Sequence, residues 1–283
     1  MPTGFSIGPL TIRFYGLLIM IGVLAALALA TREALLRKKD PDFIYDAFPW
    51  VLIAGVLGAR IWHILTPPQS MVDQGVTTRY YLTHLEEAVA VWKGGLGIYG
   101  AVLGGGAALL IYTAIKGRSF WVWADILAPG VALAQAVGRW GNFINQEVYG
   151  LPTSLPWAIY IDPQHRYPGF EDQAFYHPLF LYESLWSLLN MAVLLWLSRN
   201  KRDQLREGSL FLLYVIIYGI GRFGLEFLRL DVSTAGGVNV NQWFVLSAAA
   251  AVGALLVYRQ QAWSSRRREE QDTAGSGKGE SRH

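Results

Sequence analysis

The stretch GRWGNFINQEVYG, residues 138–150, carries an arginine, two asparagines and a glutamate directly after a long apolar run. Arginine suits phosphate because its planar guanidinium makes paired hydrogen bonds and stays charged. Asn142, Asn145 and Glu147 add donors and acceptors near Arg139. The stretch therefore indicates a site for a phosphate-bearing group. The alternative is a polar cap that only ends the apolar run, which Gly138 and Gly141 would permit.

A second polar group lies inside a later apolar run. Its members follow one another at intervals of 4, 4 and 3 residues: Tyr218, Arg222, Glu226 and Arg229. This spacing places them on one face of a helix. Arg222 and Glu226 could simply neutralise each other, but that pairing leaves Arg139 and Arg229 unexplained. Because positive charges outnumber negative ones in these runs, the pattern favours a site that receives an anion.

Other polar residues occur singly in the apolar regions. In HPLFLYE, Glu183 falls one to two turns inside a helix that Pro178 would begin, and His177 is more typical of a headgroup-level side chain than of a base. Asp125 and Arg60 also lie within apolar runs and need partners. We assign supporting roles to Asp125, His177 and Glu183.

Several kinds of catalytic centre are not indicated. The chain has no cysteine, no HExxH, no Cys/His cluster, no paired-carboxylate spacing and no GxSxG. We therefore expect no metal and no cofactor, and neither a serine nor a cysteine nucleophile. Any thiol chemistry must use a sulfur atom of the substrate.

The composition indicates that a membrane positions these residues. Hydrophobic residues make up 53% of the 283 residues and charged residues only 16%, whereas an average soluble domain is about a quarter charged. Seven apolar runs are long enough to span a bilayer: Phe14–Ala30, Ala47–Leu65, Gly95–Ile115, Phe120–Val137, Pro178–Leu197, Ser209–Leu228 and Gln242–Tyr258. We predict an all-α membrane protein with seven transmembrane helices and small extracytoplasmic arm and cap segments.

The basic residues predict the orientation. Most of the 24 Lys and Arg residues follow the first, third, fifth and seventh runs, so these connections should face the cytoplasm and the N-terminus should be extracytoplasmic. A basic cytoplasmic fringe also explains the net charge of +3, so nucleic-acid binding gains no support.

The same topology divides the chain. We expect a seven-span catalytic domain over residues 1–260, with extracytoplasmic segments at about 66–93 and 138–177, and a disordered cytoplasmic tail over 261–283. The first segment contains TTRYYLTHLEEAVAVW, which could form one amphipathic helix at the interface. The second holds the strand-like WAIYID.

The glycine-rich segment WKGGLGIYGAVLGGG, residues 92–106, has two interpretations. It lacks the Lys followed by Ser or Thr of a P-loop, so small residues that let helices approach closely in lipid are the better reading. Tyr99 within it is either an ordinary aromatic of the membrane interface or a site residue.

Taken together, four motifs give a resemblance to a known family. GGLGIYGAV, GRWGNFINQEVYG, HPLFLYE and RFGLEFLR, in this order within a seven-span chain, resemble prolipoprotein diacylglyceryl transferases. The resemblance runs from RFYGL at residues 13–17 through Arg229. It implies transfer of the diacylglyceryl group of phosphatidylglycerol to the thiol of a lipobox cysteine in a prolipoprotein, with release of glycerol phosphate. It also implies a multi-pass protein of the bacterial plasma membrane, and we favour a monomer.

The resemblance also assigns residues. Arg139 and Arg222 fall on the family's arginines and are the first catalytic candidates. We assign substrate binding to Tyr15, Arg60, Asn142, Asn145, Glu147, Gly150, Tyr218, Glu226 and Arg229. Many members have a histidine, often proposed as the base, where this chain has Tyr99. A tyrosine with a pKa of about 10 is a poor base, so we expect this third catalytic candidate mainly to position substrate while nearby positive charge activates the thiol.

Two other function classes remain open. A transporter or flippase for an anionic lipid or solute would also carry buried charges, but the two polar segments are not copies of each other and seven spans do not divide into equal halves. A non-enzymatic receptor would not need arginines and asparagines crowded at one depth of several spans.

Overall fold

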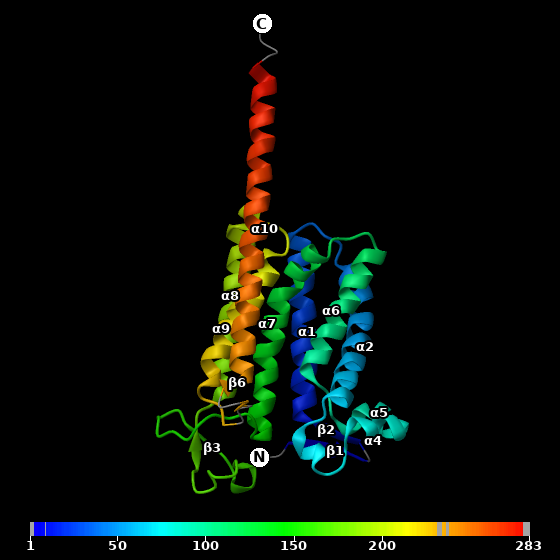
Figure 1. The fold of residues 1–283 in the computed structure, drawn as a ribbon, viewed down its shortest axis with the longest axis vertical. Coiled ribbons are helices and arrows are strands. Elements are labelled where there is room, and N and C mark those ends of the chain that lie inside the picture. The colour runs from blue at the N-terminus through cyan, green and yellow to red at the C-terminus, as the bar shows by residue number, and fades with distance from the viewer. Residues whose placement is uncertain (1–2, 9, 231–233, 236–237, 280–283) are drawn as a thin grey trace. The chain divides into compact units, whose positions relative to one another are not determined.

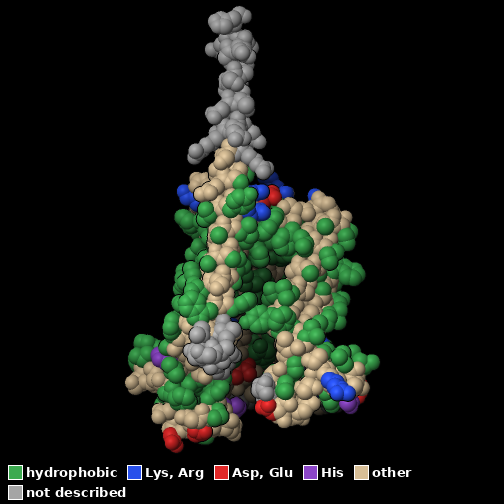
Figure 2. Space-filling view, in the orientation of Figure 1, with side chains coloured by type: hydrophobic (Ala, Val, Ile, Leu, Met, Phe, Trp, Pro, Cys, Tyr) green, Lys and Arg blue, Asp and Glu red, His purple; other side chains and the backbone are tan. Residues whose placement is uncertain are grey.

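The protein is an all-α membrane protein, as predicted. The computed structural model describes residues 3–8, 10–230, 234–235 and 238–279. Within these residues, seven helical segments are long and apolar enough to cross a membrane: α1 Phe14–Leu36, α2 Asp42–Leu65, α6 Ile98–Ile115, α7 Phe120–Asn145, α8 Leu179–Asn200, α9 Ser209–Glu226, and Asn241–Ser265 of α10 (Val240–Gly279). Figure 2 shows hydrophobic side chains along the helices, with charged side chains gathered toward their ends.

The remaining elements are short. They are the strands β1 Gly4–Ile7, β2 Leu10–Arg13, β3 Ile159–Tyr160, β4 Phe175–Tyr176, β5 Thr234–Ala235 and β6 Val238–Asn239, and the helical turns α3 Gln69–Val72, α4 Thr78–Thr83, α5 Leu85–Val89, η1 Val91–Lys93, η2 Pro163–His165 and η3 Arg202–Gln204. The strands form three antiparallel pairs, β1 with β2, β3 with β4 and β5 with β6.

The chain divides into two compact units, residues 1–33 with 121–283, and residues 34–120. The first unit holds nearly all of α1 and α7, together with α8, α9, α10 and the segment 146–178, which we call the cap (Figure 1). The second holds α2, α6 and the connection 66–97 between them, which we call the arm.

Polar contacts as well as apolar packing join the helices of the first unit. Ser184 Oγ on α8 donates to the carbonyl of Ala136 on α7 at 3.0 Å, and Trp186 Nε1 donates to the carbonyl of Ile217 on α9 at 2.7 Å. A buried Asn190 also donates to a carbonyl of α9. Such side-chain bonds hold helices together in lipid, where apolar burial alone gives little preference for a partner.

The C-terminal end of α7 lies beyond the predicted boundary. The helix continues through Asn145 instead of ending near Val137, so the alternative of a polar cap that ends the helix at Gly138 and Gly141 is wrong. An ideal Cβ on Gly141 would lie 2.7 Å from Cε2 of the Tyr15 ring. Gly141 therefore serves close packing of α1 on α7, and the first polar motif is mostly helical.

Glycines bring α2 and α6 together in the second unit. Gly58 on α2 faces Gly100 and Gly104 on α6, and an added Cβ on any of the three would overlap backbone of the other helix. The reading of the glycine-rich segment as a packing surface is thus supported.

The arm does not form the single amphipathic helix that was expected. Two short helices, α4 and α5, are separated at His84. The Arg60 guanidinium holds the chain that follows, because it donates to the carbonyls of Glu87, of Ala88 at 2.8 Å, of Gly94 at 2.7 Å and of Gly95 at 3.0 Å.

The cap is a small folded region with its own core. The predicted strand in WAIYID is present as β3, which pairs with β4. Tyr149, Ile161 and Tyr176 are buried together. Tyr149 Oη donates to the carbonyl of His165 at 2.6 Å and accepts the N–H of Tyr167 at 2.8 Å. The Tyr149 hydroxyl therefore holds the loop around His165 and Tyr167, which has few of the backbone hydrogen bonds found in helices and sheets.

The predicted tail remains a prediction. The helical backbone of α10 extends to Gly279, but the side chains beyond Ser265 and residues 280–283 lie outside the described residues.

Candidate active site

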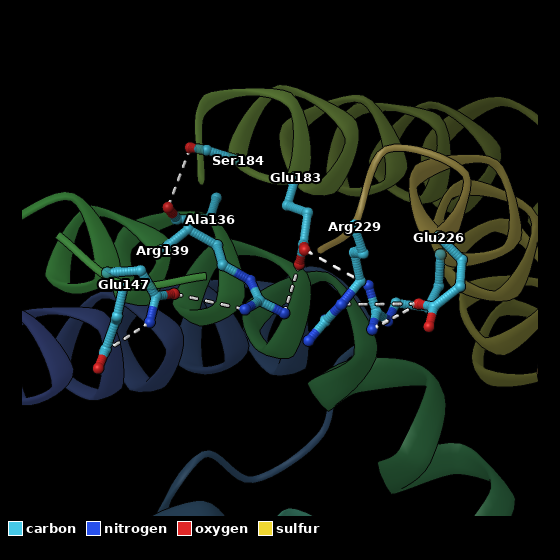
Figure 3. Close-up of polar contacts among 9 residues, drawn as sticks. Ala136, Arg139, Glu147, Glu183, Ser184, Glu226 and Arg229 are labelled. Atoms are coloured by element: carbon cyan, nitrogen blue, oxygen red, sulfur yellow. Dashed lines mark hydrogen bonds and ion pairs between the residues drawn. The ribbon is translucent and has the colours of Figure 1, made fainter. Parts of the chain in front are cut away.

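A carboxylate on α8 lies between arginines of two other helices. Glu183 Oε2 forms an ion pair with Arg139 Nη2 on α7, and Glu183 Oε1 lies 3.7 Å from Arg222 Nη1 on α9. Figure 3 shows the Glu183 side chain directed toward Arg139. The two polar motifs thus meet at one group, although Arg139 and Arg222 are 83 residues apart in the sequence. Sequence analysis gave Glu183 only a supporting role.

Tyr218, Arg222 and Glu226 of the second motif lie on α9 at the predicted helical spacing, but Arg229 follows the end of the helix, so the prediction of one helical face with all four residues is only partly correct. Arg222 Nη2 lies 2.8 Å from Glu226 Oε2, and Arg229 Nε lies 3.9 Å from the same oxygen. The alternative reading was therefore correct that Arg222 and Glu226 pair. It was incomplete, because Arg222 also lies near Glu183.

The first motif extends the network from α7 toward the cap. Arg139 Nη1 donates to Asn142 Oδ1 at 3.4 Å, and Asn142 Nδ2 donates to Glu147 Oε1 at 2.9 Å. Asn145 Nδ2 donates to the same Glu147 oxygen at 3.3 Å. Figure 3 shows the line of side chains from Glu147 through Arg139 to Glu183. The amides separate the carboxylate of Glu147, which is exposed, from the guanidinium of Arg139.

Among the described residues, the ion pairs in the inner part of this network join more arginines than carboxylates. Three guanidinium groups, those of Arg139, Arg222 and Arg229, contact the two carboxylates of Glu183 and Glu226. The side chains of Glu183 and Glu226 are only 7% and 1% exposed. Charges in poorly hydrated surroundings interact more strongly than in water. An incoming anion would balance this charge.

Some hydrogen-bonding capacity in the network is unused. Glu183 Oε1, Arg222 Nη1 and Glu226 Oε1 are buried and have no hydrogen-bond partner among the described residues. A buried polar atom without a partner is costly, and native proteins keep few of them. Arg222 Nη1 therefore has donor capacity that no hydrogen bond to the described residues uses.

Gly150 and Arg229 are joined through backbone. They form an antiparallel bridge, and Leu151 N–H donates to the carbonyl of Leu228 at 2.8 Å. A Cβ on Gly150 would lie 2.8 Å from that carbonyl oxygen and 2.9 Å from Cβ of His177. Gly150 is therefore suited to close packing of the cap on the end of α9, beside Arg229. Its predicted contact with substrate remains a prediction.

Two tyrosines assigned to substrate binding border the network. Tyr15 packs on Gly141, next to Asn142. Tyr218 lies one turn before Arg222 on α9, and its ring stacks on Tyr214 with centroids 6.3 Å apart.

Two supporting residues have contacts away from the arginines. Asp125 accepts the N–H groups of Gly208 and Phe211, both at 2.8 Å, and so caps the N-terminus of α9. His177 Nδ1 lies 3.2 Å from Tyr182 Oη, and its backbone carbonyl accepts the N–H of Gly150 at 3.0 Å. Both residues organise the elements that carry the network.

The other two site candidates belong to the second unit. The Arg60 guanidinium binds backbone carbonyls of the arm, which gives it a structural role within that unit. Tyr99 is the second residue of α6, and its half-exposed ring packs on Trp62 with centroids 5.5 Å apart. Their predicted contacts with substrate remain predictions.

Comparison with known proteins identifies a family for the chain. Residues 2–258 match the family model described as prolipoprotein diacylglyceryl transferase. The phosphatidylglycerol–prolipoprotein diacylglyceryl transferase of Thermosynechococcus vestitus is 41% identical over 254 residues, which are 90% of each chain. The protein of that name from Nostoc sp. strain PCC 7120 is 39% identical over 252 residues, 88% of this chain and 86% of the relative.

The chain belongs to the prolipoprotein diacylglyceryl transferase family. A further relative, phosphatidylglycerol–prolipoprotein diacylglyceryl transferase 2 of Streptomyces coelicolor, is 42% identical over 254 residues, 89% of this chain and 77% of the relative. The family match includes every candidate site residue and stops before the predicted tail. In this member of the family, Glu183 lies between Arg139 and Arg222.

The sequence analysis did not identify Gln146 and Asp162, which bind each other. Gln146 within the first motif is buried and binds Asp162 of the cap through both ends of its amide. The sequence signal that could have identified Gln146 is its polar amide, because the charged and amide residues around it in the motif had been assigned to the site.

Proposed function

We propose that this protein transfers the diacylglyceryl group of phosphatidylglycerol to the thiol of a lipobox cysteine in a prolipoprotein. The products are a thioether-linked lipoprotein precursor and glycerol phosphate. Membership of the family supports the reaction. The observation that carries the site assignment is the approach of Arg139 and Arg222, from two helices, to the single carboxylate of Glu183.

The reaction is a displacement at a glycerol carbon. The thiolate sulfur forms a bond to the carbon that bears the phosphodiester, and the bond between that carbon and oxygen breaks. The electron pair leaves with the oxygen, so the phosphate gains one negative charge, and the thiol proton passes to a base or to water. Glycerol phosphate is the leaving group. The protein must therefore stabilise negative charge on phosphate in the transition state.

The arginines are the groups that suit this task. Each guanidinium offers a planar pair of donors to phosphate oxygens, and Arg222 Nη1 is buried and makes no hydrogen bond among the described residues, although it lies 3.7 Å from Glu183 Oε1. In a poorly hydrated site, fixed donors stabilise developing charge more than the same groups do in water. We assign charge stabilisation to Arg139 and Arg222, and orientation of these arginines to Glu183, Glu226 and Asn142. Tyr99 remains our candidate for positioning substrate by hydrogen bonding.

The proposed orientation places this site on the outer side of the bacterial plasma membrane. The site lies at the ends of α7, α8 and α9 that adjoin the cap. The opposite end of α8 leads into Arg199, Lys201 and Arg202, and short basic connections usually face the cytoplasm. An N-terminus outside and a C-terminus inside follow from this orientation.

A transporter is the less favoured function. Buried charges alone fit both classes, but the family is one of transferases. A flippase would move labelled phosphatidylglycerol between leaflets without adding mass to a peptide.

The experiment is a transfer assay with purified protein in vesicles containing phosphatidylglycerol. A lipobox peptide with one cysteine should gain the mass of a diacylglyceryl group on sulfur, and glycerol phosphate should be released in equal amount. The matched Cys→Ser peptide should gain nothing. Absence of added mass on the cysteine peptide, with protein that remains folded, would refute the function.

A further inference from the structure

The backbone around Glu147 has an unusual conformation. Gln146 and Val148, the residues on either side, have φ angles of 52° and 55°. Residues other than glycine rarely adopt this left-handed region, and a β-branched valine there is a genuine outlier. Strained backbone of this kind persists only where surrounding contacts enforce it, and it is concentrated at functional sites.

The contacts that enforce it come from the cap. Gln146 Nε2 donates to Asp162 Oδ2 at 2.7 Å, and Gln146 Oε1 accepts the backbone N–H of Asp162 at 2.7 Å. The side chain of Gln146 is buried. Both ends of one amide are thereby tied to one residue 16 positions later in the sequence, and we call this pair of bonds the Gln146–Asp162 clamp.

The turn that the clamp holds directs Glu147 back onto α7. Glu147 N–H donates to the carbonyl of Asn142 at 3.0 Å, while its carboxylate accepts from the side chains of Asn142 and Asn145. With its amide nitrogen bound to Glu147, Asn142 presents its oxygen to Arg139. A polar chain thus runs from Asp162 through Gln146 and the Glu147 turn to the guanidinium of Arg139.

We propose that the Gln146–Asp162 clamp is a positioning device for the transfer reaction: it fixes the strained turn at Glu147 and, through Asn142, the orientation of Arg139. This inference rests on the proposed function and goes beyond it, because it assigns a role to two residues outside the set proposed to bind substrate. The clamp makes the cap part of the machinery that orients the phosphate-binding group.

Exchanging donor and acceptor between the side chains of Gln146 and Asp162 distinguishes a positioning role from a general effect on protein stability. Gln146→Glu places a carboxylate against Asp162 Oδ2, so two acceptors face each other. Adding Asp162→Asn supplies an N–H donor to the new carboxylate and restores two hydrogen bonds. Asp162→Asn alone keeps an acceptor for Gln146 and should lose less activity than Gln146→Glu.

We expect Gln146→Glu to lower kcat by roughly 10- to 100-fold, the effect of a misplaced catalytic group, with a smaller change in KM for phosphatidylglycerol. The double variant should regain most of the lost kcat. Gln146→Gly is the second test, because glycine adopts a φ near 52° without strain and yet removes the clamp. It should stay folded and still lose kcat. Gln164→Glu is the matched control, since it adds the same charge at an exposed cap position near Asp162.

The outcomes separate the two proposals. Failure of the wild type to modify the lipobox peptide would refute the proposed function. With an active wild type, a wild-type kcat in either Gln146→Glu or Gln146→Gly would overturn the clamp. A loss in Gln146→Glu that Asp162→Asn does not relieve would overturn it as well, as would an equal loss in Gln164→Glu.

Discussion

Glu183 on α8 forms an ion pair with Arg139 on α7, and its second carboxylate oxygen lies 3.7 Å from Arg222 on α9. One buried acid therefore holds two arginines whose like charges would otherwise keep them apart. Removing one partner of a buried ion pair leaves an uncompensated charge, which is strongly destabilising. Under the proposed function, Glu183 would therefore hold both guanidinium groups where they can bind one phosphate.

Glu183→Gln should disturb this arrangement while keeping the shape of the side chain. The amide still offers one acceptor but no charge, so Arg139 and Arg222 should move apart. We expect kcat for transfer to fall by roughly 10- to 100-fold, measured by peptide mass. Glu86→Gln, an exposed arm residue, is the control for loss of one carboxylate. Wild-type transfer by Glu183→Gln would show that the bridging acid is dispensable.

Asp125→Ala should affect stability rather than chemistry. Asp125 caps α9 by accepting two N–H groups at 2.8 Å. Loss of a charged cap costs about 1–3 kcal/mol, so the Tm in detergent should fall while the fraction that remains folded keeps its kcat. A normal Tm with reduced kcat would instead assign Asp125 to the reaction.

Substitutions of Tyr99 test its role. Tyr99→Phe keeps the ring on Trp62 but removes the hydroxyl. If Tyr99 positions substrate through one hydrogen bond, kcat/KM should fall by roughly 5- to 10-fold. A loss of about 100-fold or more is the size expected for a general base and would contradict the positioning role.

Tyr99→His adds a measurement of pH dependence. A histidine acting as base should give a rate that rises with pH near 6 to 7. A rate profile unchanged from that of wild type would show that a side chain at this position takes no proton.

The cap should lose stability at alkaline pH. Burial raises the pKa of the Tyr149 hydroxyl to about 12, above the ordinary value of about 10. The folded state therefore keeps a proton that the unfolded state releases, and stability should fall as pH rises from 10 to 12. Burial also raises the pKa of Tyr176, which acts in the same direction.

Tyr149→Phe isolates this contribution. It leaves the N–H of Tyr167 and the carbonyl of His165 without their partner, which costs about 1–3 kcal/mol at neutral pH. Its Tm should then depend less on pH between 10 and 12 than that of wild type. An identical alkaline slope in the two proteins would assign the loss to other groups.

The sequence was sufficient for the helices but not for their partners. Apolar runs of spanning length located the seven segments found among the described residues, and the intervals between Tyr218 and Glu226 identified the polar face of α9. The further interval to Arg229 did not, because the helix ends at Glu226. Periodicity says which residues share a face, not which helix that face meets. The central place of Glu183 therefore needed the structure.

Two further features depend on contacts that sequence does not encode locally. Gly141 is compatible with either a helix end or close packing, and the Tyr15 ring against it shows that it serves packing. The Gln146–Asp162 clamp joins a helix end to an irregular loop. In such a loop, hydrophobic periodicity does not indicate which residues contact each other.

Single-turnover transfer by Arg222 variants tests the central claim most directly. With wild type, Arg222→Ala and Arg222→Lys in vesicles of phosphatidylglycerol, the rate of mass addition to the lipobox peptide isolates the chemical step. Arg222→Ala should lose roughly 100- to 1000-fold with little loss of folded protein, and Arg222→Lys should recover part of the rate through charge alone. A folded Arg222→Ala protein that transfers at nearly the wild-type rate would contradict the account.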